Sequence, residues 1–288
     1  MRRLAQPDMD AKTVYESCVA EVLDLTLKTR LTNAEPDLLK MVAKYLSRAP
    51  LNELHMSAAS DWGKDDQIVV AGLTKKELTN LYSTHMVKGE GLARTFYDKL
   101  MLAPQSRCPY CGFGQVSTLD HFLPKSYYPA FSVLPANLVP SCKDCNTGKG
   151  SGKLTANSQV AHPYFESDLV EKQLWLHVVV RQTSPASVEY VVRAPVNWPL
   201  DLAERVANHF RDFDLASRYG VEAGREIISL ASYLDKLTTP ESVRKHLQIT
   251  SEVELELHKN SWEAALYAAL AASDWYCDGG WRLPEPQA

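Results

Sequence analysis

The sequence has no basic excess, no long apolar segment and few cysteines. Its 288 residues carry 31 Lys and Arg against 35 Asp and Glu, a formal charge of −4. A protein that coats duplex nucleic acid through charge alone usually shows the opposite balance. The longest purely apolar run, residues 264–272, is about half of the ~20 residues that a membrane-spanning helix needs. Polar residues at 6–10 argue against a signal peptide. We therefore expect a cytoplasmic protein without membrane contact.

The hydrophobic and charged fractions are those of an ordinary globular protein, at 45% and 23%. Three- and four-residue apolar spacing predicts helices from about 11 to 103, and Thr74 to Glu77 forms a capping-box pattern that starts one of them. Two β-rich runs, 173–180 and 188–192, predict a hairpin. Helical spacing returns after Pro199, with a helix start at Thr239. The predicted class is α+β, with mostly helical flanks.

Changes in these patterns divide the chain into three predicted parts. Residues 1–104 form a helical region, 105–165 a central module, and 166–288 a β-hairpin followed by helices. The central module has short loops rich in Gly, Pro and aromatics, and no helical spacing before Cys142. We expect the chemistry of the protein to lie in this module.

Four of the six cysteines form two CxxC pairs, Cys108 with Cys111 and Cys142 with Cys145. A reducing compartment makes a disulfide framework an unsuitable explanation. Two such pairs supply the four thiolates that Zn²⁺ prefers in structural sites, and 30 residues are inserted between them. The alternative is four unrelated buried cysteines. Cys18 and Cys277 fit apolar faces, and we expect buried thiols there.

The insert and the second pair carry polar residues that core packing does not explain. Asp120 and His121 are adjacent on an expected extended segment, and alone they would be a surface dipeptide. Asn137 and Asn146 follow in order, and two lysines, Lys125 and Lys149, are candidate contacts to phosphate groups. Solvated surface lysines are the alternative for the last two. His162, among aromatics after the module, is more typical of a packed residue than of a second catalytic centre.

The stretch from Cys108 to Lys149 resembles the HNH endonuclease motif of the ββα-metal fold with zinc-binding CxxC pairs. The resemblance implies that His121 is the general base that activates water. It implies that Asp120 and Asn146 hold a catalytic divalent ion, and that Asn137 orients the loop and the histidine. Many members have His where this chain has Asn146. Oxygen ligands suit Mg²⁺ or Mn²⁺, with Zn²⁺ as the structural ion of the cysteines.

The implied reaction is hydrolysis of phosphodiester bonds, with DNA favoured over RNA as substrate and with 5′-phosphate and 3′-hydroxyl products. The runs from His121 to Ser126 and from Asn137 to Cys142 also resemble, more loosely, the HNH components of Septu-type anti-phage defence pairs. That resemblance implies an ATPase partner. Two alternatives stay open: a zinc-stabilised binding module without catalysis, and an HNH toxin that cuts RNA. Residues that address the phosphate do not distinguish DNA from RNA.

The net charge conceals an uneven distribution. Residues 106–154 contain five basic and two acidic side chains, a local charge of +3, so the rest of the chain carries −7. We expect the acidic flanks to repel non-specific duplex and the basic module to meet the substrate.

Overall fold

The structure is a computed structural model that describes residues 1–102, 107–150 and 152–282. The chain forms two compact units, an N-terminal unit (Arg2–Glu166) and a C-terminal unit (Ser167–Ala288, together with Met1). The boundary predicted at 104 lies outside the described residues. Helices and short strands are mixed, as predicted, and helices predominate.

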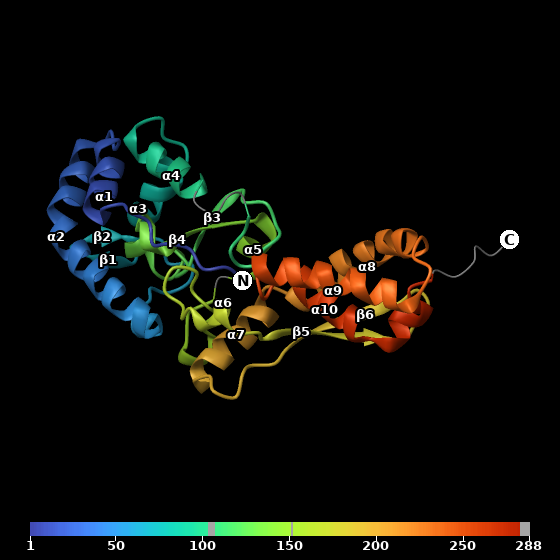
Figure 1. Ribbon diagram of the computed structural model, residues 1–288. Coiled ribbons are helices and arrows are strands. Elements are labelled where there is room, and N and C mark those ends of the chain that lie inside the picture. The colour runs from blue at the N-terminus through green and yellow to red at the C-terminus, as the bar shows by residue number, and fades with distance from the viewer. Residues whose placement is uncertain (103–106, 151, 283–288) are drawn as a thin grey trace. The chain divides into compact units, whose positions relative to one another are not determined.

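Helices form most of the first hundred residues of the N-terminal unit (Figure 1). Their bounds are α1 (Ala11–Ala20), α2 (Leu25–Arg48), α3 (Lys75–Asn80), the π-helix η3 (Leu81–Met86) and α4 (Leu92–Leu102), with 3₁₀ turns η1 (Ala49–Leu51) and η2 (Leu54–Met56). Asp10 and Asp24 cap α1 and α2 by accepting backbone N–H bonds. The capping box from Thr74 to Glu77 starts α3, as predicted.

The prediction of continuous helical structure up to 103 is wrong between α2 and α3. A small hairpin of β1 (Ile68–Val70) and β2 (Leu73–Thr74) lies there. Its turn places Ala71 and Gly72 at positive φ, 47° and 75°. Such turns favour Asn-Gly or Gly-Gly, so an alanine at the first position hides the turn from sequence analysis.

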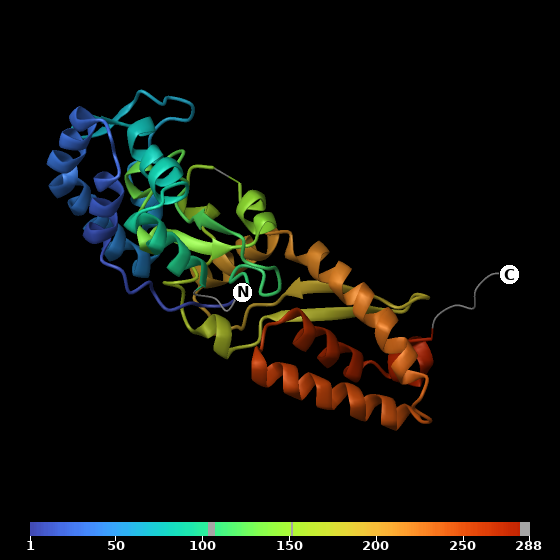
Figure 2. The ribbon, with the colours of Figure 1, turned by 90° about the horizontal axis from the view of Figure 1, so that it is seen from above.

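The central segment folds as two antiparallel strands followed by a helix. The elements are β3 (Thr118–His121), β4 (Leu138–Ser141) and α5 (Lys143–Gly148), and the register pairs His121 with Leu138. Two 3₁₀ turns, η4 (Pro129–Phe131) and η5 (Pro135–Asn137), lie in the long connection between the strands, and η6 (Ala156–Ser158) follows α5. Figure 2 shows α5 beside the β3–β4 pair.

One hydrophobic core joins this segment to the helices. Leu119, Val133 and Leu138 are buried in the same cluster as apolar residues of α1, α2, η3 and α4. The central segment therefore does not stand apart from the helical region, and the helices fix the position of β3.

The C-terminal unit is built on the predicted hairpin. Strands β5 (Leu176–Arg181) and β6 (Ser187–Val192) pair along their whole length, with α8 against β6 and α10 against β5 (Figure 2). The remaining elements are α6 (Leu169–Lys172), α7 (Leu200–Asp212), α8 (Leu215–Leu234), α9 (Pro240–Leu257), α10 (Trp262–Ala272) and the π-helix η7 (Tyr276–Gly280). Thr239 caps α9, as predicted. Within the described ranges, no helix combines the length and apolar character that a membrane crossing requires.

Candidate metal centre and active site

The four cysteines of the CxxC pairs come together at one buried point. Their Sγ atoms all lie within 4.8 Å of one another, and the Sγ atoms of Cys111 and Cys142 are 3.9 Å apart. A tetrahedron of sulfurs ~2.3 Å from a zinc ion has edges of about 3.8 Å. The cysteines are free thiols rather than disulfides. The cluster therefore has the donor set and the spacing of a structural zinc site. Cys18 and Cys277 are separate and buried, as predicted.

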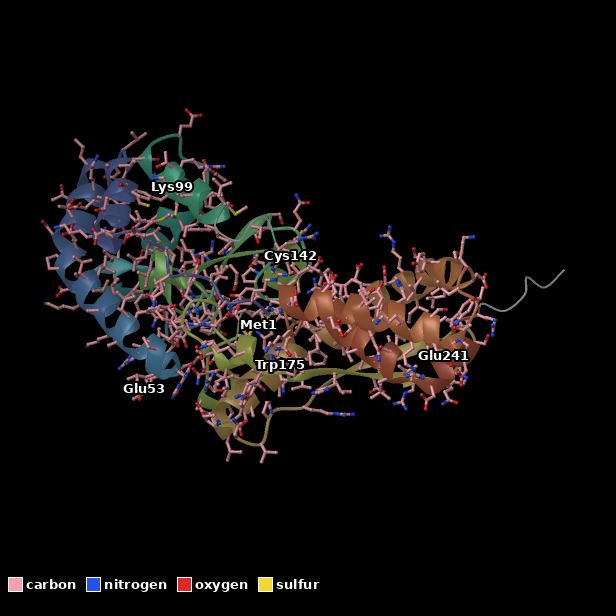
Figure 3. All side chains as sticks on the ribbon, viewed as in Figure 1. Met1, Glu53, Lys99, Cys142, Trp175 and Glu241 are labelled. Atoms are coloured by element: carbon pink, nitrogen blue, oxygen red, sulfur yellow. The ribbon has the colours of Figure 1, made fainter. Side chains whose placement is uncertain are left out.

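Two turns bring the sulfurs into reach. In the first, the Cys108 N–H donates to Gly114 O, and Gly112 adopts a φ of +82°. A Cβ on Gly114 would lie 2.8 Å from the Cys142 Sγ, so only glycine allows the turn to approach the second pair. In the second turn Cys142 caps α5, and the Cys145 N–H donates to its sulfur at 3.4 Å. Figure 3 labels Cys142 at this start of the helix.

Asp120 is held by the first cysteine turn and by the residue that follows α5. Its Oδ2 accepts from the hydroxyl of Tyr110, which lies inside the first CxxC pair, at 2.8 Å. The same oxygen accepts from Lys149, one residue beyond α5, at 2.7 Å. Within the described ranges, no hydrogen bond reaches Oδ1 of Asp120. A bound cation would therefore find one carboxylate oxygen still available.

The ammonium group of Lys149 points into the protein, whereas a contact to a substrate phosphate requires an ammonium group at the surface. Besides Asp120, its ammonium donates to the carbonyls of His121 and Phe122, at 3.0 and 2.8 Å. A lysine has three donors, and all three now have acceptors within this unit. Burial lowers the pKa of Lys149, while Asp120 opposes this effect. The lysine therefore joins the end of α5 to β3.

His121 at the end of β3 has a defined tautomer. Its Nε2 lies 2.8 Å from the carbonyl oxygen of Ser132. A carbonyl only accepts, so Nε2 carries the proton and Nδ1 carries the lone pair. Burial, followed by the charge of Lys125, lowers the pKa of His121 to about 3, although the Ser132 bond opposes this. The imidazole is therefore neutral at neutral pH, and none of the described residues forms a hydrogen bond with Nδ1.

Asn137 is fully buried and holds the loop that supplies this carbonyl. Its Oδ1 accepts from the Leu123 N–H at 2.7 Å and from the Tyr45 hydroxyl at 3.2 Å. Its Nδ2 donates to the carbonyls of Leu123 and Phe131, each at 3.1 Å. Phe131 precedes Ser132, so Asn137 fixes the backbone that holds His121.

Asn146 on α5 is oriented by β3. Its Nδ2 donates to the Thr118 Oγ1 at 3.1 Å, while that hydroxyl lies 3.2 Å from the carbonyl of Ser141. If the Thr118 proton goes to the carbonyl, its oxygen accepts the amide, and the Asn146 Oδ1 is left as a potential ligand.

The proposed site residues line one pocket of about 250 Å³. Asp120, His121 and Asn146 line it together with Lys125 and Trp62. An aspartate, an asparagine and a neutral histidine therefore border the same space. This arrangement can hold a hard divalent cation and take a proton from a water beside it.

Several residues of this region escaped the sequence analysis. Tyr82 of η3 contacts His121 edge-on, with ring centroids 4.4 Å apart, and the Lys125 ammonium lies 4.6 Å from its ring centroid. Tyr45 links Asn137 to His162, whose Nε2 is 3.2 Å from its hydroxyl. His162 is packed, as predicted, and stacks on Phe122. Only Tyr110 had a local clue, its place between two ligand cysteines.

Comparisons with known proteins give two similarities. The chain is 28% identical over 291 residues to protein ea31 of Escherichia phage lambda. The aligned region covers 95% of this chain and 98% of that protein. It is 42% identical over 62 residues to the Septu protein PtuB of Bacillus thuringiensis, covering 19% of this chain and 24% of that protein. No family model and no solved structure matches.

Proposed function

We propose that this chain is a metal-dependent endonuclease of the HNH type that hydrolyses phosphodiester bonds, with DNA as the preferred substrate. The observation that carries the proposal is the shared pocket of Asp120, His121 and Asn146, with the lone pair of His121 at Nδ1. A backbone carbonyl that fixes the proton on Nε2 leaves the other nitrogen of the imidazole able to act as a general base.

Each group has a separate task in the proposed reaction. His121 Nδ1 takes the proton of a water that attacks the phosphorus, the bond to the 3′ oxygen breaks, and that oxygen takes a proton from solvent water. Asp120 and Asn146 would hold Mg²⁺ or Mn²⁺, which would supply positive charge for the phosphate and the leaving oxygen. Asn137 keeps the Ser132 carbonyl on Nε2. Lys125, which borders the pocket, contacts a phosphate oxygen.

The four cysteines hold Zn²⁺ in a structural role. Tyr110 lies within the first CxxC pair and bonds to Asp120, and α5 starts at the second pair and carries Asn146. A zinc ion would therefore fix both proposed ligands of the catalytic ion.

The biological role that we propose is anti-phage defence in company with an ATPase partner. The similarity to a Septu protein supports this setting, over the 24% of that protein that is matched.

A panel of substrates tests the activity. Purified chain is incubated with supercoiled plasmid, linear duplex, single-stranded DNA and tRNA, in Mg²⁺, Mn²⁺ or EDTA, with and without a co-expressed ATPase from a neighbouring gene. We expect metal-dependent cutting of DNA with 5′-phosphate and 3′-hydroxyl ends. Preferential cutting of tRNA would favour the RNA-directed alternative. The absence of cutting under every condition would favour a non-catalytic zinc module.

A further inference from the structure

We propose that Trp62 is a stacking platform for one unpaired nucleobase beside the phosphate that is cut, so that the substrate is single-stranded or locally unpaired there. This inference rests on the proposed nuclease function and specifies its substrate.

Trp62 is unusually placed for a tryptophan of this chain. Its residue is 62% exposed, whereas the other five tryptophans are buried or partly buried. It also lines the pocket that contains Asp120, His121 and Asn146. A large exposed ring at the edge of a polar pocket is available to a ligand that extends out of that pocket.

The loop that carries Trp62 is anchored through the two residues that precede the ring. The Ser60 N–H donates to the Tyr127 carbonyl, and the Asp61 N–H donates to Gln67 Oε1, both at 2.7 Å. The buried side chain of Lys75 donates to the Asp61 carbonyl at 2.7 Å. The Trp62 ring itself lies 5.8 Å from that of Tyr127, centroid to centroid. An exposed ring on a fixed backbone loses little conformational freedom when a base stacks on it.

The loop carries charges of both signs, with Asp61, Asp65 and Asp66 against Lys64. Lys64 forms a 2.9 Å ion pair with Asp61 and is the main cause of the lowered pKa of that carboxyl. The cation that lines the pocket together with Trp62 is Lys125. An aromatic ring beside a basic side chain is typical of surfaces that bind single strands.

The pocket is small for a whole nucleotide. At about 250 Å³ it is smaller than the ~300–1,000 Å³ of ordinary ligand sites, which suits a phosphate and leaves the attached base at the rim. In a duplex, both faces of each base are covered by neighbouring pairs. Only an unstacked base can offer a face to Trp62.

Binding measurements test this in a protein that does not cut. His121→Ala protein and the His121→Ala/Trp62→Ala double variant are titrated, with Mg²⁺ present, into a fluorescein-labelled 12-nucleotide single strand and into a blunt duplex of the same sequence. We expect the double variant to bind the single strand about 5- to 150-fold more weakly, because stacking on one aromatic ring is lost. Duplex binding should not change.

Three controls isolate the stacking interaction. Trp62→Phe should retain most of the affinity, and Tyr233→Ala, which removes another exposed aromatic from α8, should bind as the parent does. A strand with abasic sites at every position should bind equally well to proteins with and without Trp62. Retained zinc content and far-UV circular dichroism show that the variants are folded.

Failure of the inference is distinguishable from failure of the nuclease proposal. Equal affinity of both proteins for the single strand, an equal loss for the duplex, or no binding of either nucleic acid would overturn the role of Trp62. Metal-dependent cutting of single strands that is unchanged in Trp62→Ala would also overturn it and leave the nuclease intact. Trp62-dependent binding without any cutting would support the platform and contradict the nuclease.

Discussion

The polar atoms around His121 form a chain of contacts in which each residue fixes the next. The Tyr45 hydroxyl lies within 3.2 Å of Asn137 Oδ1, and Asn137 Nδ2 donates to the Phe131 carbonyl. The following carbonyl, that of Ser132, accepts from His121 Nε2. The orientation of the proposed base therefore depends on a residue that need not touch the substrate.

Asn137→Ala should destabilise the protein and abolish cutting together. The change leaves the Leu123 N–H and the carbonyls of Leu123 and Phe131 without their partner. Each buried unsatisfied group costs about 1–3 kcal/mol, so we expect the free energy of unfolding to fall by at least about 3 kcal/mol. Urea denaturation measures this loss. Plasmid cutting is assayed without urea, where the variant is still folded.

Asn260 offers a matched control in the C-terminal unit. It is equally buried and also makes four side-chain bonds, to the N–H groups of Trp175 and Leu176 and to the carbonyls of Val170 and Gln173. Asn260→Ala should destabilise its own unit and leave cutting by the folded protein intact. Equal loss of cutting in both variants would contradict a specific role for Asn137.

The two CxxC turns link the zinc site to the proposed catalytic groups at the scale of secondary structure. The first turn contains Tyr110, which bonds to Asp120, and the second starts α5, which carries Asn146. The cysteine cluster therefore connects the residue that bonds to Asp120 with the start of α5.

Gly114→Ala should weaken zinc binding. The added methyl would lie 2.8 Å from the Cys142 Sγ and 3.2 Å from the Cys111 Sγ, so at least one sulfur must move. Gly114→Ala should release its zinc to a chromogenic chelator at a lower chelator concentration than the parent protein does. Gly220→Ala is the control, because a methyl there meets no atom within 4 Å and lies in α8. Equal zinc retention in both variants would contradict this explanation of Gly114.

Glu77→Gln should reduce stability at neutral pH and have less effect in acid. Burial raises the pKa of Glu77, but bonds from Arg30 and Thr74 outweigh it, and the net pKa is lowered. A carboxyl with a lowered folded-state pKa stabilises the protein above its unfolded pKa of about 4.3 and loses this effect as pH falls through the folded value. Melting temperatures of both proteins at pH 7, 5, 4 and 3 should converge as the pH falls through the lowered folded-state pKa of Glu77. A constant difference would show that the Glu77 charge is not involved.

Across the whole molecule, the sequence predicted features formed by neighbouring residues better than contacts between distant segments. The CxxC spacing predicted the sulfur cluster, and the β-rich runs predicted the hairpin of β5 and β6, because both depend on residues close in the chain. The partners Tyr45, Tyr82 and Trp62 come from distant segments and follow no local spacing. The same applies to Lys149, whose burial depends on β3 lying against α5.

Association with an ATPase partner is a prediction about the whole molecule. Tagged chain, co-expressed with the ATPase of a neighbouring gene, should retain that protein through affinity purification and gel filtration, whereas an ATPase from an unrelated operon should be lost. Because the flanks outside the module carry −7, we expect the isolated chain to cut duplex weakly and the complex to cut it faster. Absence of co-purification would count against the defence pair and leave the nuclease proposal standing.

The most direct measurement compares plasmid cutting by His121→Ala with cutting by His177→Ala, a histidine substitution on β5 outside the pocket. Initial rates in Mg²⁺ and zinc content are measured on the same preparations. We predict that His121→Ala keeps its zinc and its circular dichroism but loses about 10²- to 10⁴-fold in rate, the usual contribution of a general base. His177→Ala should cut at the parent rate. Equal rates for the parent protein and His121→Ala would contradict the assignment of His121 as the catalytic base.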